Sequence, residues 1–226
     1  MKHYFFVAIF GFLFYFVQCQ THVFIDVNGD TISKGSYRSK MRNRDLNLRH
    51  WSWVDEKGKY FHKLEKGRYY KGYFDYNLIK TELEKIIPYT VTDSSTIIIE
   101  YYFKDDLCSD PHKDNKWTSS EISERKSFLN PIKKDLRNRG IFFISLFEKG
   151  IKLRNRPTSK NEYFFVDENN FFKENLFKSP TTCGSHAAIK TNNQTLVQNG
   201  ENRADYFAEN LSKENWSLFF SSATKE

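Results

Sequence analysis

The chain carries the run Thr96-Ile-Ile-Ile-Glu-Tyr-Tyr-Phe103 and, further on, the run Ile141-Phe-Phe-Ile-Ser-Leu-Phe147. Short runs of β-branched and aromatic residues are typical of strands that are buried on both faces of a sheet. The segment between them, 119–139, has apolar residues at near-helical spacing and predicts a helix that ends at Gly140. A strand, helix, strand unit predicts two parallel neighbouring strands joined by a right-handed crossover.

Further elements are predicted on both sides of this unit. Two apolar runs flank the polar turn Thr191-Asn-Asn-Gln194 and predict an antiparallel hairpin, which Gly200 separates from a final amphipathic helix. Pro88 closes another amphipathic helix, upstream of the first strand. In chain order, these further elements are a helix at 77–87, a short helix at 169–177, strands at 187–190 and 195–198, and a helix at 203–218.

Residues 20–92 are richer in basic and aromatic residues than the rest of the chain. The stretch 31–72 holds twelve Lys or Arg and four Asp or Glu, whereas the charges elsewhere nearly cancel. The pattern predicts a hairpin around Asn28-Gly29, a basic helix over 36–49 and short strands over 57–74. Such a region could bind an anionic glycan or membrane surface, although charged runs more often only face water. The first basic residues of the stretch are Lys34, Arg38, Lys40, Arg42, Arg44 and Arg49.

Residues 1–19 are typical of a cleavable secretory signal peptide. A positive charge at Lys2 precedes an unbroken apolar run over 4–17, and polar residues follow. This run is shorter than the roughly 20 residues that a membrane-spanning helix needs. We therefore predict cleavage after Cys19, export to the periplasm, the cell envelope or the exterior, and no transmembrane anchor in the mature chain. Lipidation of Cys19 is the alternative, and Gln18 weakens it because a lipoprotein signal normally has a small residue there.

The order strand, helix, strand, helix, hairpin, helix across residues 95–218 resembles the thioredoxin fold. The segment Cys183-Gly-Ser-His-Ala-Ala-Ile-Lys-Thr-Asn-Asn-Gln-Thr-Leu-Val-Gln-Asn-Gly200 is similar to the closing hairpin of that family, with an apolar strand, a polar turn, a second strand and a glycine before the last helix. The resemblance implies an α/β domain over 93–226, a thioredoxin-like sheet with flanking helices. The residues before it, 20–92, would form an α+β extension.

The redox motif of the family is missing from this chain. Thioredoxins carry Cys-x-x-Cys at the start of the helix after the first strand, where this chain has Asp105-Asp-Leu-Cys-Ser-Asp-Pro-His112 with a single cysteine. The family also has a cis-proline just before the hairpin, where this chain has Ser185. Dithiol exchange needs an attacking thiolate and a nearby resolving thiol, so the resemblance does not imply ordinary thioredoxin activity. The acidic residues of the loop, Asp105 and Asp106 among them, are typical of a solvated turn.

Two cysteines remain after the predicted cleavage, Cys108 and Cys183. The resemblance implies that Cys108 lies at the end of the first strand, near a helix N-terminus, and that the loop of Cys183 faces this helix, so the two could meet. In an exported protein such a pair more often forms a structural disulfide than a catalytic centre. In the chain-entropy model a bridge that closes so long a loop stabilises the fold by about 4 kcal/mol.

Two other roles for these residues stay open. In the first, Cys108 is the nucleophile and Cys183 the resolving thiol of a thiol-disulfide oxidoreductase or a peroxidase-like enzyme. In the second, Cys108, His112, Cys183 and His186 bind zinc or copper, because two thiolates and two imidazoles make an acceptable tetrahedral set.

We favour a non-enzymatic interpretation, an exported thioredoxin-like binding or interaction module of the cell envelope whose cysteines are paired for stability. Its expected partner is another protein or an anionic component of the envelope, and nucleic acid is not expected because exported proteins meet little of it. The sequence has no Gly-rich phosphate loop and no strand-turn-helix serine elbow. No cofactor is therefore predicted, apart from the zinc or copper of the second alternative.

Overall fold

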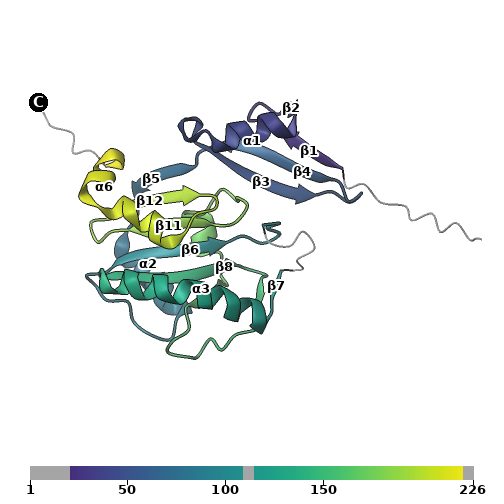
Figure 1. Ribbon diagram of the computed structural model, residues 1–226. Coiled ribbons are helices and arrows are strands. Elements are labelled where there is room, and N and C mark those ends of the chain that lie inside the picture. Colours follow the sequence, from purple (N-terminus) through teal and green to yellow (C-terminus); the bar gives the residue numbers. More distant parts are fainter. Residues whose placement is uncertain (1–20, 109–114, 221–226) are drawn as a thin grey trace, which may run out of the picture.

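The computed structural model describes residues 21–108 and 115–220 of the 226-residue chain. In Figure 1 the first part of the chain forms a small sheet, and the rest forms a larger sheet with helices on both faces. The elements of the small part are β1 (His22–Ile25), β2 (Thr31–Ile32), α1 (Lys34–Arg42), the 3-10 helix η1 (Arg44–Leu46), β3 (Leu48–Val54) and β4 (Tyr60–Lys66). Those of the large part are β5 (Tyr69–Tyr73), α2 (Tyr76–Ile86), β6 (Thr96–Tyr102), β7 (Lys116–Trp117), α3 (Ser119–Asn138), β8 (Ile141–Glu148), β9 (Lys152–Leu153), β10 (Phe164–Asp167), α4 (Phe171–Asn175), β11 (Ser185–Ile189), β12 (Gln194–Asn199), α5 (Ala204–Ala208), the 3-10 helix η2 (Glu209–Leu211) and α6 (Lys213–Phe219).

The two apolar runs form the centre of the large sheet. β6 and β8 pair in parallel, with Ile98 opposite Phe143, and α3 connects them, as predicted. α3 begins with a capping box, in which Thr118 Oγ1 accepts a hydrogen bond from Glu121 N and the Glu121 carboxylate accepts one from Thr118 N. Gly140 takes the left-handed conformation just after the helix, with φ of 72°, and ends it.

The closing hairpin pairs with the same sheet. β11 runs antiparallel to β6, and β12 runs antiparallel to β11, so the strand order is β10-β8-β6-β11-β12-β5. β10 extends the parallel part of the sheet beside β8, and β5 pairs with β12 at the other edge. A parallel strand-helix-strand unit followed by an antiparallel hairpin makes the fold thioredoxin-like, as the resemblance implied.

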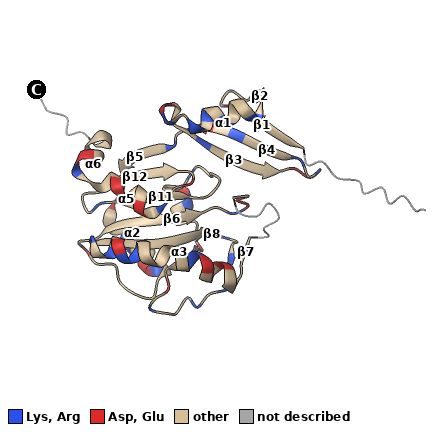
Figure 2. Cartoon of the chain, in the orientation of Figure 1, with Lys and Arg blue, Asp and Glu red and all other residues tan. Residues whose placement is uncertain are grey.

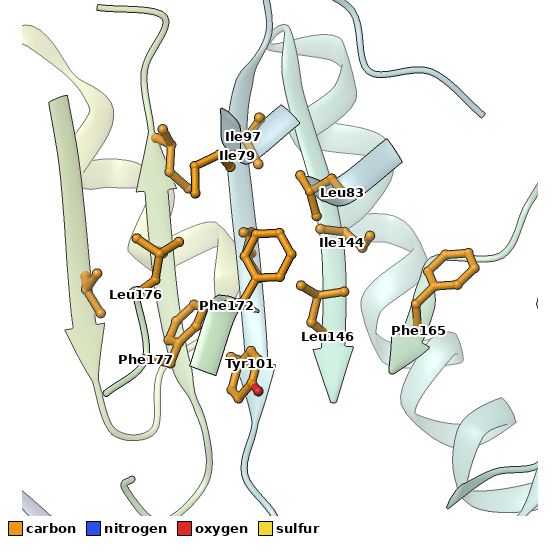
Figure 3. Close-up of a cluster of buried hydrophobic side chains, with 14 of the residues drawn as sticks. Ile79, Leu83, Ile97, Tyr101, Ile144, Leu146, Phe165, Phe172, Leu176 and Phe177 are labelled. Carbon is orange, nitrogen blue, oxygen red and sulfur yellow. The ribbon is translucent and has the colours of Figure 1, made fainter. Parts of the chain in front are cut away.

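Residues of β6 contribute alternately to two hydrophobic cores, one on each face of the large sheet. Ile97 and Ile99 belong to the core with α2 and α4 shown in Figure 3, whereas Ile98 belongs to the core with α3, α5 and α6. Because side chains alternate along a strand, one apolar run supplies both cores. Full burial of each such side chain stabilises the fold by about 1.5–3 kcal/mol. Figure 3 labels Ile79, Leu83, Ile97, Tyr101, Ile144, Leu146, Phe165, Phe172, Leu176 and Phe177 in the first core.

The small part is a four-stranded sheet of order β2-β1-β4-β3, on which α1 packs over a core that includes Leu48 and Leu64. The predicted hairpin of β1 and β2 is present. The predicted helix over 36–49 is wrong beyond Arg42, because Asn43 is extended and ends α1. The 3-10 turn η1 follows, and it ends at Asn47, which takes the left-handed conformation just before β3 begins. Asparagine adopts this conformation at low cost, and here it lets the chain reverse direction.

The large part begins earlier in the chain than residue 93, the predicted boundary. β5 (Tyr69–Tyr73) completes one edge of the large sheet, and α2 buries Ile79 and Leu83 in its core. Only residues 22–66 of the predicted extension therefore form the small sheet. The pattern over 57–74 indicates strands correctly but carries no information about which sheet each strand joins.

The predicted final helix over 203–218 is divided into α5, a 3-10 turn and α6. Ser212 lies between the two helices, and its side chain accepts a hydrogen bond from Asn215 N at 3.2 Å. Serine is a favoured N-cap, so it starts a new helix where the apolar spacing alone predicts continuity.

The small sheet contacts the large part through β3. Thr182 N donates to His50 O at 3.0 Å, and Arg49 Nη1 donates to Pro180 O at 2.7 Å. Both partners on the large part, Pro180 and Thr182, lie within three residues before Cys183 in the chain. The contact therefore links the small sheet to the loop that carries this cysteine.

His50 makes the stability of the small sheet sensitive to acid. Its Nδ1 is buried without a hydrogen-bond partner among the described residues, and burial, together with the charges of His62 and Arg49, lowers its pKa to about 4. An unfolded histidine has a pKa of about 6.5, so between these two values the unfolded chain binds more protons and stability falls as the pH is lowered. When the pH is lowered from about 7 to about 4.5, we expect the melting temperature of the wild type to fall by roughly 5 °C more than that of His50→Gln. Thermal melts followed by circular dichroism measure this difference, and equal drops in the two proteins would contradict it.

Candidate functional site

The site is organised around a disulfide between Cys108 and Cys183, whose Cα atoms are 4.8 Å apart. The pairing predicted for these two cysteines is confirmed. It follows from the strand register: β11 runs antiparallel to β6 with Ser185 opposite Tyr101, so the start of β11 lies beside the end of β6. The residues just after β6 and just before β11 are thereby brought together.

Asp106 holds the backbone of both cysteines. Its Oδ1 accepts a hydrogen bond from Cys108 N and its Oδ2 accepts one from Cys183 N, each at 2.9 Å. A carboxylate that bonds to two backbone N–H groups is a charge-assisted acceptor, which strengthens both bonds. Asp106 is therefore a structural partner of the disulfide rather than the solvated turn residue that composition predicted.

Gly184 allows the close approach between the Cys183 loop and β6. Its φ is 77°, and a Cβ atom at this position would lie 2.7 Å from Tyr101 O. Any other residue would force the loop away from the strand. Cys183 itself has φ of 67°, so the two residues before β11 share a left-handed backbone that sharpens the turn into the strand.

Cys108 does not lie in the first turn of α3, whereas the resemblance implied a place near a helix N-terminus. Among the described residues α3 is the first helix after β6; it begins at Ser119, and the capping box of Thr118 and Glu121 occupies its N-terminus. The helix dipole acts within the first turn, so it does not favour a thiolate at Cys108. Cys108 is exposed and Cys183 is half-buried.

A pocket of about 450 Å³ opens beside the disulfide. This volume lies within the range of small-molecule sites. Aromatic side chains from several elements line the pocket, together with two arginines and two carboxylates. The lining residues are Tyr102, Phe103, Asp106, Cys108, Asn115, Trp117, Arg125, Phe128, Ile151, Cys183, Glu201, Asn202, Arg203 and Tyr206.

Five of these residues form an alternating stack, which we call the arginine–aromatic ladder: Tyr102, Arg125, Phe128, Arg203 and Tyr206. The Arg125 guanidinium carbon lies 5.8 Å from the Tyr102 ring centroid and 5.2 Å from that of Phe128. The Arg203 guanidinium carbon lies 5.6 Å from Phe128 and 4.4 Å from Tyr206. Guanidinium groups over aromatic faces are attracted to the ring quadrupole, so the ladder holds both arginines in place.

A buried polar network supports one end of the ladder. Glu100 is almost fully buried on β6, and it accepts hydrogen bonds from Arg125 Nη2 at 2.6 Å and from Ser145 Oγ at 2.8 Å. His186, on β11, is also buried, with Nε2 3.7 Å from Glu100 Oε1. Burial lowers the pKa of His186 and outweighs the attraction of Glu100, so the imidazole is neutral near pH 7. The network pairs the buried charge of Glu100 with Arg125.

The residues of the predicted zinc or copper site, Cys108, His112, Cys183 and His186, differ in their surroundings. Both sulfur atoms are joined in the disulfide and are not thiolates, while His186 faces Glu100 and Phe207 in the sheet interior. His112 lies outside the described residues. Across residues 21–108 and 115–220 no group of three metal-ligating side chains is assembled. Metal binding stays a prediction, and it can concern only the reduced protein because the ligands must be thiolates.

The basic residues of the small part lie mainly on its surface. Figure 2 shows Lys and Arg along α1, β3 and β4. Lys40 forms an ion pair with Asp26 at 3.0 Å, and Arg49 pairs with Glu65. Four other basic residues of this part have no ion pair in the described part of the chain: Lys34, Arg38, Arg42 and Arg44. This surface therefore keeps an excess of positive charge.

Comparisons with known proteins give fold-level resemblances only. No protein family model matches the chain. No curated protein matches its sequence either. Among solved structures, the N-terminal domain of PilB from Neisseria gonorrhoeae is 13% identical, with a TM-score of 0.36, over 55% of this chain and 80% of that one. The exposed lipoprotein thioredoxin Etrx1 from Streptococcus pneumoniae strain TIGR4 is 10% identical, with a TM-score of 0.36, over 73% and 98%.

A third similar structure is a putative thiol:disulfide interchange protein DsbE from Chlorobium tepidum, 10% identical with a TM-score of 0.31 over 72% of this chain and 89% of that one. At such TM-scores the assignment of a thioredoxin-like fold rests on the strand order and pairing of this chain itself.

As for membrane insertion, none of the helices within the described ranges combines the length and apolarity needed to cross a bilayer.

The disulfide closes a long loop, so its removal has a predictable cost. Replacing both Cys108 and Cys183 by serine should lower the free energy of unfolding by about 4 kcal/mol, because the unfolded chain regains the entropy that the crosslink removes. Urea denaturation of the double variant measures this loss. Reduced wild-type protein is the matched control and should unfold at the same urea concentration as the variant. A variant as stable as the oxidised wild type would contradict this account.

Proposed function

We propose that this protein is an exported, non-catalytic binding protein with a thioredoxin-like fold, and that it binds its ligand in the pocket beside the Cys108–Cys183 disulfide. The observation that carries the proposal is that this disulfide and the arginine–aromatic ladder line the same pocket. In this account the crosslink fixes one wall and the ladder fixes another. The chemistry of the site is then recognition of a ligand and not turnover.

Three features support a structural role for the disulfide. The two cysteines are separated by 75 residues, so they lack the adjacent resolving thiol of a Cys-x-x-Cys motif. Asp106 accepts hydrogen bonds from the backbone of both, and a carboxylate so close disfavours a second negative charge on either sulfur. Among the described residues the first helix after β6 is α3, which begins only at Ser119, so its dipole does not offset that charge. A catalytic thiol needs the opposite environment, one that favours the thiolate.

A second candidate function is thiol-disulfide exchange, and the exposure of Cys108 favours it. In the reduced protein the Cys108 thiolate would attack a disulfide of the substrate, which forms a mixed disulfide and releases one substrate thiolate. The Cys183 thiolate would then attack Cys108 Sγ, which re-forms the Cys108–Cys183 bond and releases the second substrate thiolate. The protein is oxidised and the substrate reduced by two electrons, so turnover needs an external dithiol reductant.

Export is part of the proposal and rests on residues 1–19. An oxidising compartment keeps a disulfide formed, whereas the reducing cytosol does not, so export and a structural disulfide are consistent with each other. The unpaired positive charge on the small sheet suits a protein that meets an anionic component of the envelope or an acidic partner protein.

A reductase assay separates the two candidate functions. We expect the wild-type protein, supplied with dithiothreitol, to reduce insulin no faster than dithiothreitol alone, and Cys108→Ser to behave in the same way. The physical reason is that neither sulfur lies where a thiolate is stabilised. A rate above background that disappears in Cys108→Ser would overturn the non-catalytic proposal in favour of exchange. A parallel assay with hydrogen peroxide tests the peroxidase-like variant of the same chemistry.

A further inference from the structure

The arginine–aromatic ladder leaves hydrogen-bond donors available inside the pocket. Arg125 uses Nε for the Tyr102 hydroxyl and Nη2 for Glu100. Arg203 uses Nε and Nη2 for the carboxylate of Asp205. The Nη1 atoms of both have no hydrogen-bond partner among the described residues, and both side chains are partly exposed, 31% for Arg125 and 45% for Arg203. Two oriented donor groups thus remain on arginines that line a pocket whose other walls are largely aromatic.

A guanidinium fixed in this way recognises a planar oxyanion. Arginine presents its donors in a rigid plane that matches the geometry of carboxylate and phosphate. The two arginines are separated by the ring of Phe128, which each of them contacts. An oxyanion bound by the Nη1 atom of either arginine would therefore lie next to an aromatic face.

The charge balance of the pocket favours a single negative charge over two. Arg125 is already paired with Glu100, and Arg203 with Asp205. Two further carboxylates, Asp106 and Glu201, also line the pocket. Among the described residues around the pocket the arginines do not outnumber the carboxylates, so a dianionic phosphate would meet about twice the repulsion that a monoanionic carboxylate meets. A carboxylate can still gain the charge-assisted hydrogen bonds, since these depend on local geometry rather than on net charge.

The rest of the lining is suited to a flat apolar group. Phe103, Trp117, Phe128 and Tyr206 surround the space together with Ile151. Aromatic rings prefer offset-stacked or edge-on contacts with other rings, and such contacts add to the gain from burial. The cavity, at about 450 Å³, has room for one aromatic ring with a short carboxylate-bearing chain.

We propose, on the basis of the binding function proposed above, that the pocket binds an aromatic carboxylate through the arginine–aromatic ladder. The carboxylate takes hydrogen bonds from Nη1 of Arg203, the more exposed of the two arginines, and the ring lies among the aromatic side chains. The same chemistry occurs in a free aromatic acid and in the C-terminal aromatic residue of a peptide.

The test compares N-acetyl-L-phenylalanine with N-acetyl-L-phenylalanine amide, in which a neutral amide replaces the carboxylate, by calorimetry on the whole oxidised protein. We expect the acid to bind at least tenfold more tightly than the amide, because the amide loses the charge-assisted hydrogen bonds. Arg203→Gln should reduce the preference for the acid to about twofold or less. Arg156→Gln, an exposed arginine outside this pocket, is the matched control and should keep the full preference.

Additional arms identify the source and the charge of the ligand. Phenylacetate and a tetrapeptide that ends in phenylalanine distinguish a free acid from a chain end, and phenyl phosphate should bind more weakly than phenylacetate. Three results in the wild type would each overturn the proposal. They are equal binding of the acid and the amide, tighter binding of phenyl phosphate than of phenylacetate, and no binding of the acid at millimolar concentration. These ratios in wild type need no variant, so a variant that fails to fold leaves the test intact. Insulin reductase activity would overturn the non-catalytic function without affecting the acid-to-amide ratio.

Discussion

The start of β11 lies beside the end of β6, because the two strands pair antiparallel with Ser185 opposite Tyr101. This register brings the loop before β11 against the loop after β6, and Gly184 is the residue that makes the approach sterically possible. The disulfide then fastens the two loops, and Asp106 binds the backbone on both sides of it. The pocket exists because this junction lies next to α3 and the start of α5, which together with Tyr102 of β6 supply the arginine–aromatic ladder.

The parts of the fold that the sequence predicts are those with a local signal. β6 and β8 follow from composition, and the β11–β12 hairpin follows from its polar turn, since burial on both faces and turn chemistry leave a mark within a few residues. No comparable local signal in the sequence shows that β5 belongs to the large sheet or that the final helix is divided in two. β5 joins the large sheet by pairing with a strand more than a hundred residues away, and Ser212 interrupts an apolar spacing that is otherwise helical.

The site was predicted only in its cysteines. The resemblance to the thioredoxin fold implied that Cys108 and Cys183 could meet, because the two loops are neighbours in that fold. Arg125 and Arg203 could not be predicted in the same way, since Arg125 lies on α3 and Arg203 just before α5, and they meet across Phe128 only after both helices pack on the sheet. The structural role of Asp106 was also hidden, because its hydrogen bond to Cys183 N spans 77 residues and leaves no pattern in the sequence.

In the proposed binding function the Cys108–Cys183 bond holds the site together and does not turn over. Its reduction potential tests this most directly, measured by equilibrating the protein in dithiothreitol buffers and counting free thiols by mass spectrometry. A structural bond should have a potential below about −300 mV, out of reach of the glutathione pool. A potential in the range of about −120 to −270 mV, typical of exchange catalysts, would contradict the account.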